Sequence, residues 1–122
     1  MNPEVKVVDD VTIVTPHGKL LGGNETDEFQ ERVKELNEAG NMKLLINLGK
    51  TTFMTSVALA VLFLAYVKYT NRGAKVKICS VDKRIQQIFV IVKLTLIYGQ
   101  DLHDTEEEAL ASFRALPVMA SE

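Results

Sequence analysis

Short runs of apolar residues alternate along the chain with longer stretches in which apolar residues recur at helical spacing. The short runs are rich in β-branched residues and predict β-strands over residues 5–8, 11–16, 43–48 and 74–81. Asp9 and Asp10 separate the first two runs, as in a tight turn, so we expect the chain to open with an antiparallel hairpin. The third run, KLLINL, is apolar almost throughout, which favours a central strand covered on both faces.

Two stretches with apolar residues three and four positions apart predict helices that begin near residues 24 and 56. Asn24 is expected to cap the first of these helices, and Gly40 to end it. The second helix is expected to close near residue 72. Residues 17–23, which carry several glycines, are expected to form a loop before the first helix.

The last third of the chain predicts two further helices. Residues 82–93 place apolar side chains at helical spacing, but residues 89–97 are so β-branched that a strand there stays open as the alternative. A capping box at residues 105–108 predicts a helix that runs through Leu116 and ends at Pro117.

Strands that alternate with helices after an opening hairpin predict an α/β fold. We expect a mixed, mostly parallel β-sheet packed with about four α-helices. A chain of 122 residues suits one hydrophobic core. The expected organisation is a single domain over residues 1–122, with an ordered core over about 3–117 and a tail over 118–122.

Composition excludes several classes of function. The 14 basic and 16 acidic residues give a net charge of −2, which is too balanced to indicate a nucleic-acid groove or an anionic membrane surface as the partner. The longest near-continuous apolar run, residues 57–67, is shorter than the roughly 20 residues that span a bilayer, so no direct membrane insertion is expected. The single cysteine, Cys79, and an N-terminus without signal-peptide character favour the cytoplasm.

Nothing in the residue pattern indicates an enzyme. The two histidines, His17 and His103, fall in predicted loops without a ligand pair at metal spacing and are expected to be ordinary surface residues. The glycines of residues 18–23 match neither a dinucleotide loop nor a P-loop. We therefore expect no cofactor and no catalytic residue.

The second predicted helix raises two questions. Ser56 lies at or beside its cap, where a hydroxyl either bonds an orphan amide or, alternatively, accepts a phosphate beside the positive end of the helix. Residues 57–67 are apolar on all sides, so either a neighbouring helix or another protein must cover part of this surface. The same choice, core filling or self-association, applies to the aliphatic residues within 89–97.

The order of these motifs resembles the STAS domain family, named for sulfate transporters and anti-sigma factor antagonists, and especially its small stand-alone bacterial antagonists. The resemblance rests on the hairpin, the 18–23 loop, KLLINL, FMTSVALAVL, the Arg72-Gly73 turn and DTEEEALASF. It places the phosphate-accepting serine of the family signature at Ser56. The family's neighbouring aspartate falls on Thr55, its second hydroxyl on Val57 and its glycine on Ala58, and Asn47 stands where an aspartate is common.

Typical stand-alone members bind an anti-sigma factor with serine kinase activity, release the sigma factor that it holds, and are turned off when that partner phosphorylates them. The resemblance implies this function here, with Ser56 phosphorylated. It implies a docking surface on the exposed side of residues 57–66 and, residue by residue, at Leu21, Gly22, Gly23, Asn24, Thr55, Ser56, Val57, Ala58 and Leu59. The alternative, favoured by Thr55 and Val57, is a constitutive adaptor in a signalling complex or on a membrane transporter.

Overall fold

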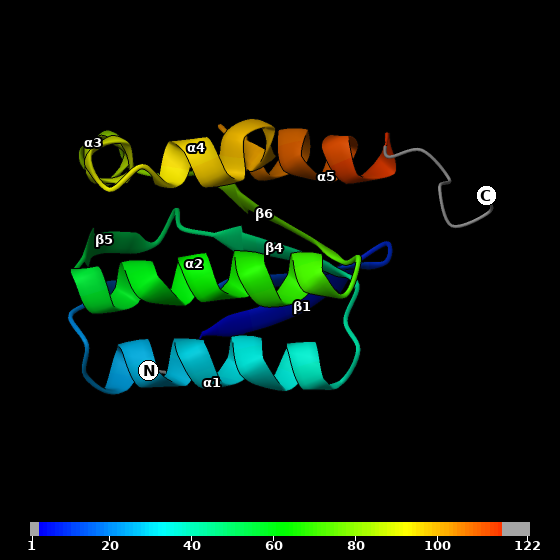
Figure 1. Cartoon of the computed structure of the whole chain (residues 1–122), viewed down its shortest axis with the longest axis horizontal. Helices are drawn as coiled ribbons and strands as arrows, with labels where there is room; N and C mark the ends of the chain where they lie inside the picture. The colour runs from blue at the N-terminus through cyan, green and yellow to red at the C-terminus, as the bar shows by residue number, and fades with distance from the viewer. Residues whose placement is uncertain (1–2, 116–122) are drawn as a thin grey trace.

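The computed structural model describes residues 3–115 (Figure 1). Its elements are, in chain order, β1 (Glu4–Val8), β2 (Val11–Thr15), β3 (Gly18–Leu20), α1 (Asn24–Glu38), β4 (Lys43–Asn47), β5 (Thr51–Met54), α2 (Ser56–Asn71), β6 (Lys75–Cys79), α3 (Lys83–Ile91), α4 (Leu94–Tyr98), the 3-10 turn η1 (Gly99–Asp101), β7 (Leu102–His103) and α5 (Glu106–Arg114). The predicted α/β class with a mixed, mostly parallel sheet is confirmed, with five α-helices where about four were expected.

The main sheet has five strands in the order β1-β2-β4-β6-β7. β1 pairs antiparallel with β2 through the predicted hairpin, and Asp9 takes a φ of 57° in its turn. The β2, β4, β6 and β7 strands pair parallel with one another. Their carboxyl ends therefore meet at one edge of the sheet.

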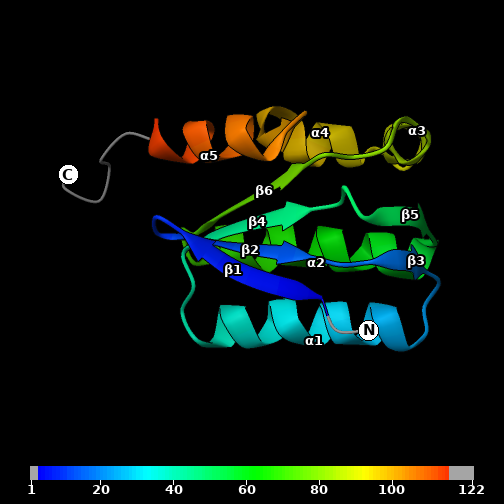
Figure 2. The ribbon, with the colours of Figure 1, turned by 180° about the vertical axis from the view of Figure 1, so that it is seen from behind.

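A second, two-stranded sheet pairs β3 with β5 in parallel. Figure 2 shows that these strands continue the paths of β2 and β4 beyond the main sheet. The expectation that residues 17–23 form only a loop was wrong, because residues 18–20 form β3. β5 was not predicted either, and both strands depend on a partner distant in sequence.

Two hydrophobic clusters cover the two faces of the main sheet. On β4, Leu44 and Ile46 pack into the larger cluster with the helices α1 to α4, whereas Leu45 packs with α5 into the smaller one. All three side chains are fully buried. The central position predicted for KLLINL is thus confirmed, since alternate residues of a strand point to opposite faces.

The α2 helix owes its apolar composition to a central position among helices. Figure 1 shows it between α1 and α4, and its inner side packs on the sheet. The Tyr98 hydroxyl of α4 donates a 2.6 Å hydrogen bond to the Leu62 carbonyl oxygen. Neighbouring helices therefore cover most of α2, but Phe63 and Leu64 stay 44% and 42% exposed on its outer side. Within residues 3–115, no helix is long and apolar enough to cross a membrane.

Helix boundaries correct several expectations. Asn24 is the first residue of α1 and Gly23 holds the cap position without a side-chain bond, so Asn24 is not the cap. The strand alternative for residues 89–97 is wrong, because this segment contains the end of α3, a left-handed turn at Lys93 (φ 64°) and α4.

The predicted cap of α5 at Thr105 is confirmed, since the Glu108 N–H donates to the Thr105 hydroxyl at 3.1 Å. α5 ends at Arg114. The predicted continuation to Leu116, the stop at Pro117 and the tail over 118–122 lie outside the described residues. The predicted single domain over residues 1–122 stays a prediction.

Candidate functional site

Ser56 is the first residue of α2 and its side chain is exposed. Thr55 occupies the cap position, but both its N–H (3.0 Å) and its hydroxyl (3.3 Å) donate to the Leu20 carbonyl oxygen. Neither hydroxyl therefore caps the helix. The capping interpretation of Ser56 was wrong: within the described chain, its hydroxyl makes no hydrogen bond and faces solvent.

The pairing of β3 with β5 brings the loop at residues 21–23 beside this hydroxyl. Leu20 and Met54 are opposite each other in the ladder, so the loop leaves β3 where α2 begins. Gly22 has a φ of +94°, and a Cβ built there would lie 3.6 Å from the Cβ of Val57. Its N–H donates a 2.9 Å bond to the Thr26 hydroxyl. The loop therefore packs directly against the first turn of α2.

Each of the segments that meet at the start of α2 carries an exposed apolar side chain. Leu21 is 56% exposed, Phe53 47% and Val57 55%, and they come from the loop, β5 and α2 respectively. We call this group the Ser56 surface: Leu21, Phe53, Val57 and Ser56, with the exposed Gly22, Gly23 and Asn24 beside them.

Three of the predicted docking residues are less accessible. Ala58 and Leu59 are buried, since their side chains point into the core beneath the first turn of α2, and Thr55 is half-buried. Phe53 was absent from the predicted set because β5 was not foreseen. Its place immediately before the helix was the available signal.

The start of α2 carries uncompensated positive potential. Its first turn contains no acidic residue and no side-chain cap, whereas the first turn of α1 holds Glu25 and Asp27. The unpaired N–H groups of a helix start, together with the helix dipole, favour a negative charge beside them. The geometry thus suits an anionic group on the Ser56 hydroxyl.

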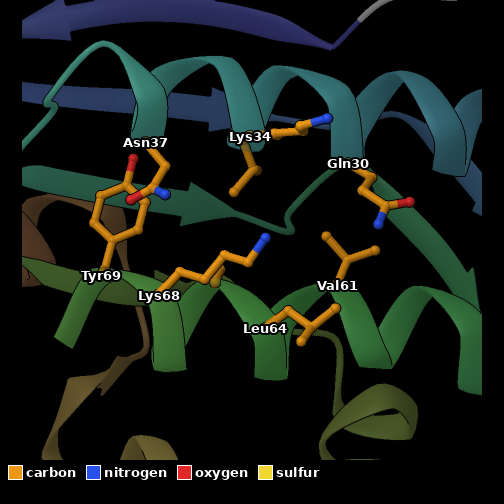
Figure 3. A pocket seen from close by; sticks show the side chains of 9 residues that line it. Gln30, Lys34, Asn37, Val61, Leu64, Lys68 and Tyr69 are labelled. Carbon is orange, nitrogen blue, oxygen red and sulfur yellow. The ribbon is translucent and has the colours of Figure 1, made fainter. Parts of the chain in front are cut away.

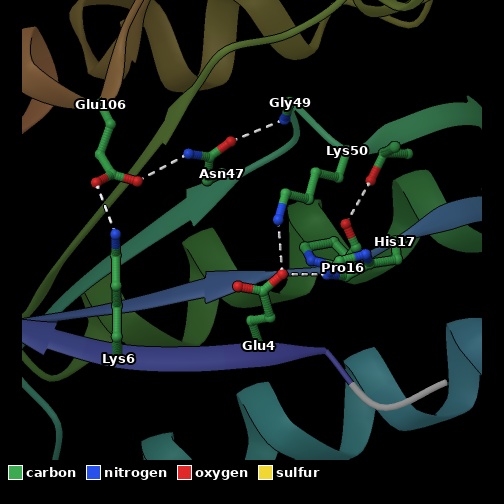
Figure 4. A network of polar contacts seen from close by, with 9 residues as sticks. Glu4, Lys6, Pro16, His17, Asn47, Gly49, Lys50 and Glu106 are labelled. Atoms are coloured by element: carbon green, nitrogen blue, oxygen red, sulfur yellow. Dashed lines mark hydrogen bonds and ion pairs between the residues drawn. The ribbon is translucent and has the colours of Figure 1, made fainter.

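A polar network lies at the carboxyl edge of the main sheet (Figure 4). A carboxylate oxygen of Glu4 accepts from Lys50 at 2.8 Å and lies 2.5 Å from His17 Nε2, and its hydrogen bond with Lys50 lowers the pKa of this carboxyl. On the other side, Glu106 accepts from Asn47 at 2.8 Å and pairs with Lys6 at 3.2 Å. These contacts tie β1 and α5 to the β4–β5 turn.

The STAS resemblance leads one to expect an aspartate at position 47. The network explains why this chain has Asn47 there instead. Its Oδ1 accepts from the Gly49 N–H at 2.8 Å while its Nδ2 donates to Glu106. An aspartate has no donor and would set a second carboxylate against Glu106.

A shallow groove runs between α1 and α2, with a volume of about 50 Å³ (Figure 3). Val61, Leu64 and Tyr69 supply apolar lining, and Lys34 and Lys68 stand at its rim. The space is too small for most ligands, whose pockets measure about 300–1,000 Å³.

The cysteine and one of the histidines, which could in principle react or bind a metal, are wholly or partly buried. Cys79 is fully buried, and burial raises the pKa of its thiol to about 11. His103 lies half-buried in β7, so its expected place in a surface loop was wrong, and desolvation lowers its pKa. Among residues 3–115, no group of three His, Cys, Asp or Glu side chains could hold a metal ion.

Comparison with known proteins gives one family and a consistent set of folds. The STAS domain family model matches residues 2–109. A proposed anti-sigma factor antagonist from Thermotoga maritima is 24% identical, with a TM-score of 0.84 over 92% of this chain and 94% of that one. The unphosphorylated anti-sigma factor antagonist SpoIIAA is 14% identical, with a TM-score of 0.73 over 93% of this chain and 99% of that one.

The STAS domain of a SulP transporter from Vibrio cholerae also matches. It is 18% identical, with a TM-score of 0.66 over 91% of this chain and 89% of that one. At these identities the likenesses establish the fold, which regulators and transporter domains share.

Proposed function

The chain belongs to the STAS domain family, and on that premise we propose that it is an anti-sigma factor antagonist controlled by phosphorylation of Ser56. In the unphosphorylated state, its Ser56 surface binds an anti-sigma factor with serine kinase activity in the cytoplasm, and a sigma factor is released. The observation that carries the proposal is the solvent-facing, unbonded hydroxyl of Ser56, set among exposed apolar side chains at an uncapped helix start.

The folded protein would tolerate the modification. A phosphate adds about −1.5 to −2 charges at neutral pH. On Ser56 it would meet the positive end of the 16-residue α2 helix, with no acidic residue in the first turn to repel it.

A docked partner would not tolerate the same phosphate. Contact with Leu21, Phe53 and Val57 buries apolar area that excludes water from the hydroxyl between them. A dianion in that contact would lose its hydration without gaining a matched cation. Phosphorylation would thus lower affinity for the partner while the fold stays intact. A protein of the same fold supports this proposal. The structure of SpoIIAA in its phosphorylated form, which is 14% identical to this chain, is also known.

Incubation with ATP and each candidate anti-sigma factor kinase of the source genome tests the switch. Phosphopeptide mass spectrometry should find phosphate on Ser56, and calorimetry should show that Ser56→Glu weakens binding to the same kinase while Ser56→Ala retains it. Thr52→Ala is a matched control, because Thr52 is an exposed hydroxyl residue on the adjoining strand. Binding without phosphate on Ser56, unaffected by Ser56→Glu, would overturn the switch.

A second candidate function is a constitutive adaptor on a membrane transporter. The similarity to the SulP transporter domain favours it, as does Val57 at a position where the family carries a hydroxyl. In that case a transporter subunit, and not a kinase, should form a complex with the purified chain. Ser56→Glu would then leave its affinity unchanged.

A further inference from the structure

The most exposed group of large aliphatic side chains lies where α3 meets α4 and shares no residue with the Ser56 surface. Val90 is 61% exposed, Ile91 76%, Val92 46% and Leu96 77%. We call these four residues the aliphatic corner. The left-handed turn at Lys93 separates the first three from Leu96. Figure 1 shows α3 and α4 following each other along one side of the molecule.

The exposure cannot be read as incomplete core packing. Ile85 and Phe89 of α3, together with Leu94 and Tyr98 of α4, are fully or almost fully buried and already fill the space against α2 and the sheet. The corner residues are outer positions of the same two helices and, for Val92, of the turn between them. Surfaces of this kind on folded proteins mark contacts with other molecules.

The charge around the corner is strongly one-sided. Residues 83–100 contain Lys83, Arg84 and Lys93 and no acidic residue. The net charge of −2 of the whole chain, from which we expected no anionic membrane surface as a partner, does not show this local excess of basic residues. Arg84 pairs with Asp82 at 3.3 Å. Lys83 and Lys93 form no ion pair within the described chain. Asp82 directly precedes Lys83 in the chain, and Asp104 lines the same hollow as Val90.

This combination fits an anionic lipid surface better than a protein. The centres of protein interfaces favour aromatic residues, methionine and arginine and are poor in lysine, whereas the corner is aliphatic with Lys93 at its middle. A second copy docking by the same patch would bring two basic segments together. Amphipathic helices that lie on membranes pair an apolar face with flanking lysine and arginine.

We propose that the α3–α4 segment, residues 83–98, adsorbs to anionic membranes. The four corner side chains enter the boundary between headgroups and acyl chains, and Lys83 and Lys93 contact lipid phosphates. The contact is peripheral and crosses no bilayer. Membrane binding requires neither Ser56 nor the partner of the proposed function. It can therefore be tested independently of that function.

Vesicle co-sedimentation of the full chain tests this proposal. We expect binding to phosphatidylcholine vesicles that contain about 30% phosphatidylglycerol, weaker binding as salt rises, and little binding to phosphatidylcholine alone. Ile91→Ser with Leu96→Ser, and separately Lys83→Glu with Lys93→Glu, should each weaken binding about fivefold or more.

Matched controls are Val7→Ser, which changes another exposed aliphatic residue, on β1 (65%), and Lys68→Glu, which changes an exposed lysine on α2. Both should bind like the wild type, and circular dichroism should confirm that every variant is folded. Equal binding to both vesicle types, or no binding to either, would overturn the proposal. Light scattering that shows a dimer dissociated by Ile91→Ser would assign the corner to self-association instead.

Discussion

The side-chain amide of Asn47 donates a 2.8 Å hydrogen bond to the carboxylate of Glu106, and so joins the end of the central strand β4 to the first turn of α5. The two residues are 59 positions apart in sequence. Their bond fixes the turn from which the chain enters β5 and then Ser56.

Replacing Asn47 by Asp should therefore destabilise the fold, although aspartate is common there in the family. The free energy of unfolding at neutral pH should fall by about 1–3 kcal/mol, because a donor is lost and two carboxylates face each other. Urea denaturation measures the change. The loss should shrink in acid, where protonation removes the repulsion. An equal loss at both pH values would mean that the two carboxylates do not interact.

The buried Lys77–Asp101 pair makes a second prediction. Lys77 Nζ lies 2.9 Å from Asp101 Oδ1 in the interior and 5.3 Å from the Phe113 ring centroid. Asp101→Asn should lower the free energy of unfolding by about 3–5 kcal/mol, because it leaves a buried ammonium without a counter-charge. The exposed pair Arg114–Asp9 offers a control, in which Asp9→Asn should cost about 1 kcal/mol or less.

A second substitution tests whether the loss of stability in the Asp101 variant comes from the unpaired charge of Lys77. Adding Lys77→Met to Asp101→Asn removes the unpaired cation and should recover much of the loss. Equilibrium denaturation of the double variant measures this recovery. No recovery would show that the site depends on Asp101 for another reason, such as its 3.0 Å pair with Lys75.

The two glycines of the docking loop should respond differently to the same substitution. Gly22→Ala forces a side chain into a φ of +94° and should cost about 1–2 kcal/mol. Gly23→Ala should cost less, because Gly23 has a φ of −99° and open space at the Cβ position. Thermal unfolding of both variants gives the comparison. Equal losses would contradict the backbone strain expected from the positive φ of Gly22.

Cys79 should be unreactive in the folded protein. Burial raises the pKa of its thiol to about 11, so almost no thiolate exists near pH 8, and the sulfur is shielded from solvent. Iodoacetamide labelling followed by mass spectrometry should therefore modify Cys79 only after urea unfolds the chain. Rapid labelling under native conditions would indicate that β6 opens readily.

Local signals predicted those parts of the fold that local residues determine. The turn at Asp9, the cap at Thr105 and the two-faced strand around Leu45 are each set by neighbours within a few positions. β3 and β5 escaped prediction because three or four residues carry little periodicity, and only their mutual pairing makes them strands.

In the candidate site, too, locally determined features could be predicted and features that depend on distant residues could not. Ser56 could be found from its place before an apolar helix, but the accessibility of its neighbours could not, since Ala58 and Leu59 turn inward only once the sheet lies beneath α2. The burial of Lys77 could not be predicted from the sequence either. A lysine within an apolar strand gave no hint that Asp101, 24 residues later, would bury it as a pair.

The short β3–β5 ladder has a consequence for how the protein moves. A pair of such strands is marginal alone, and this one forms a sheet separate from the main one, although Leu20 and Met54 pack into the larger hydrophobic cluster. We expect its amides to exchange with deuterated solvent through partial openings, at a lower free energy than amides of β4 and β6. The loop beside Ser56 can then adjust its shape while the rest of the sheet remains closed.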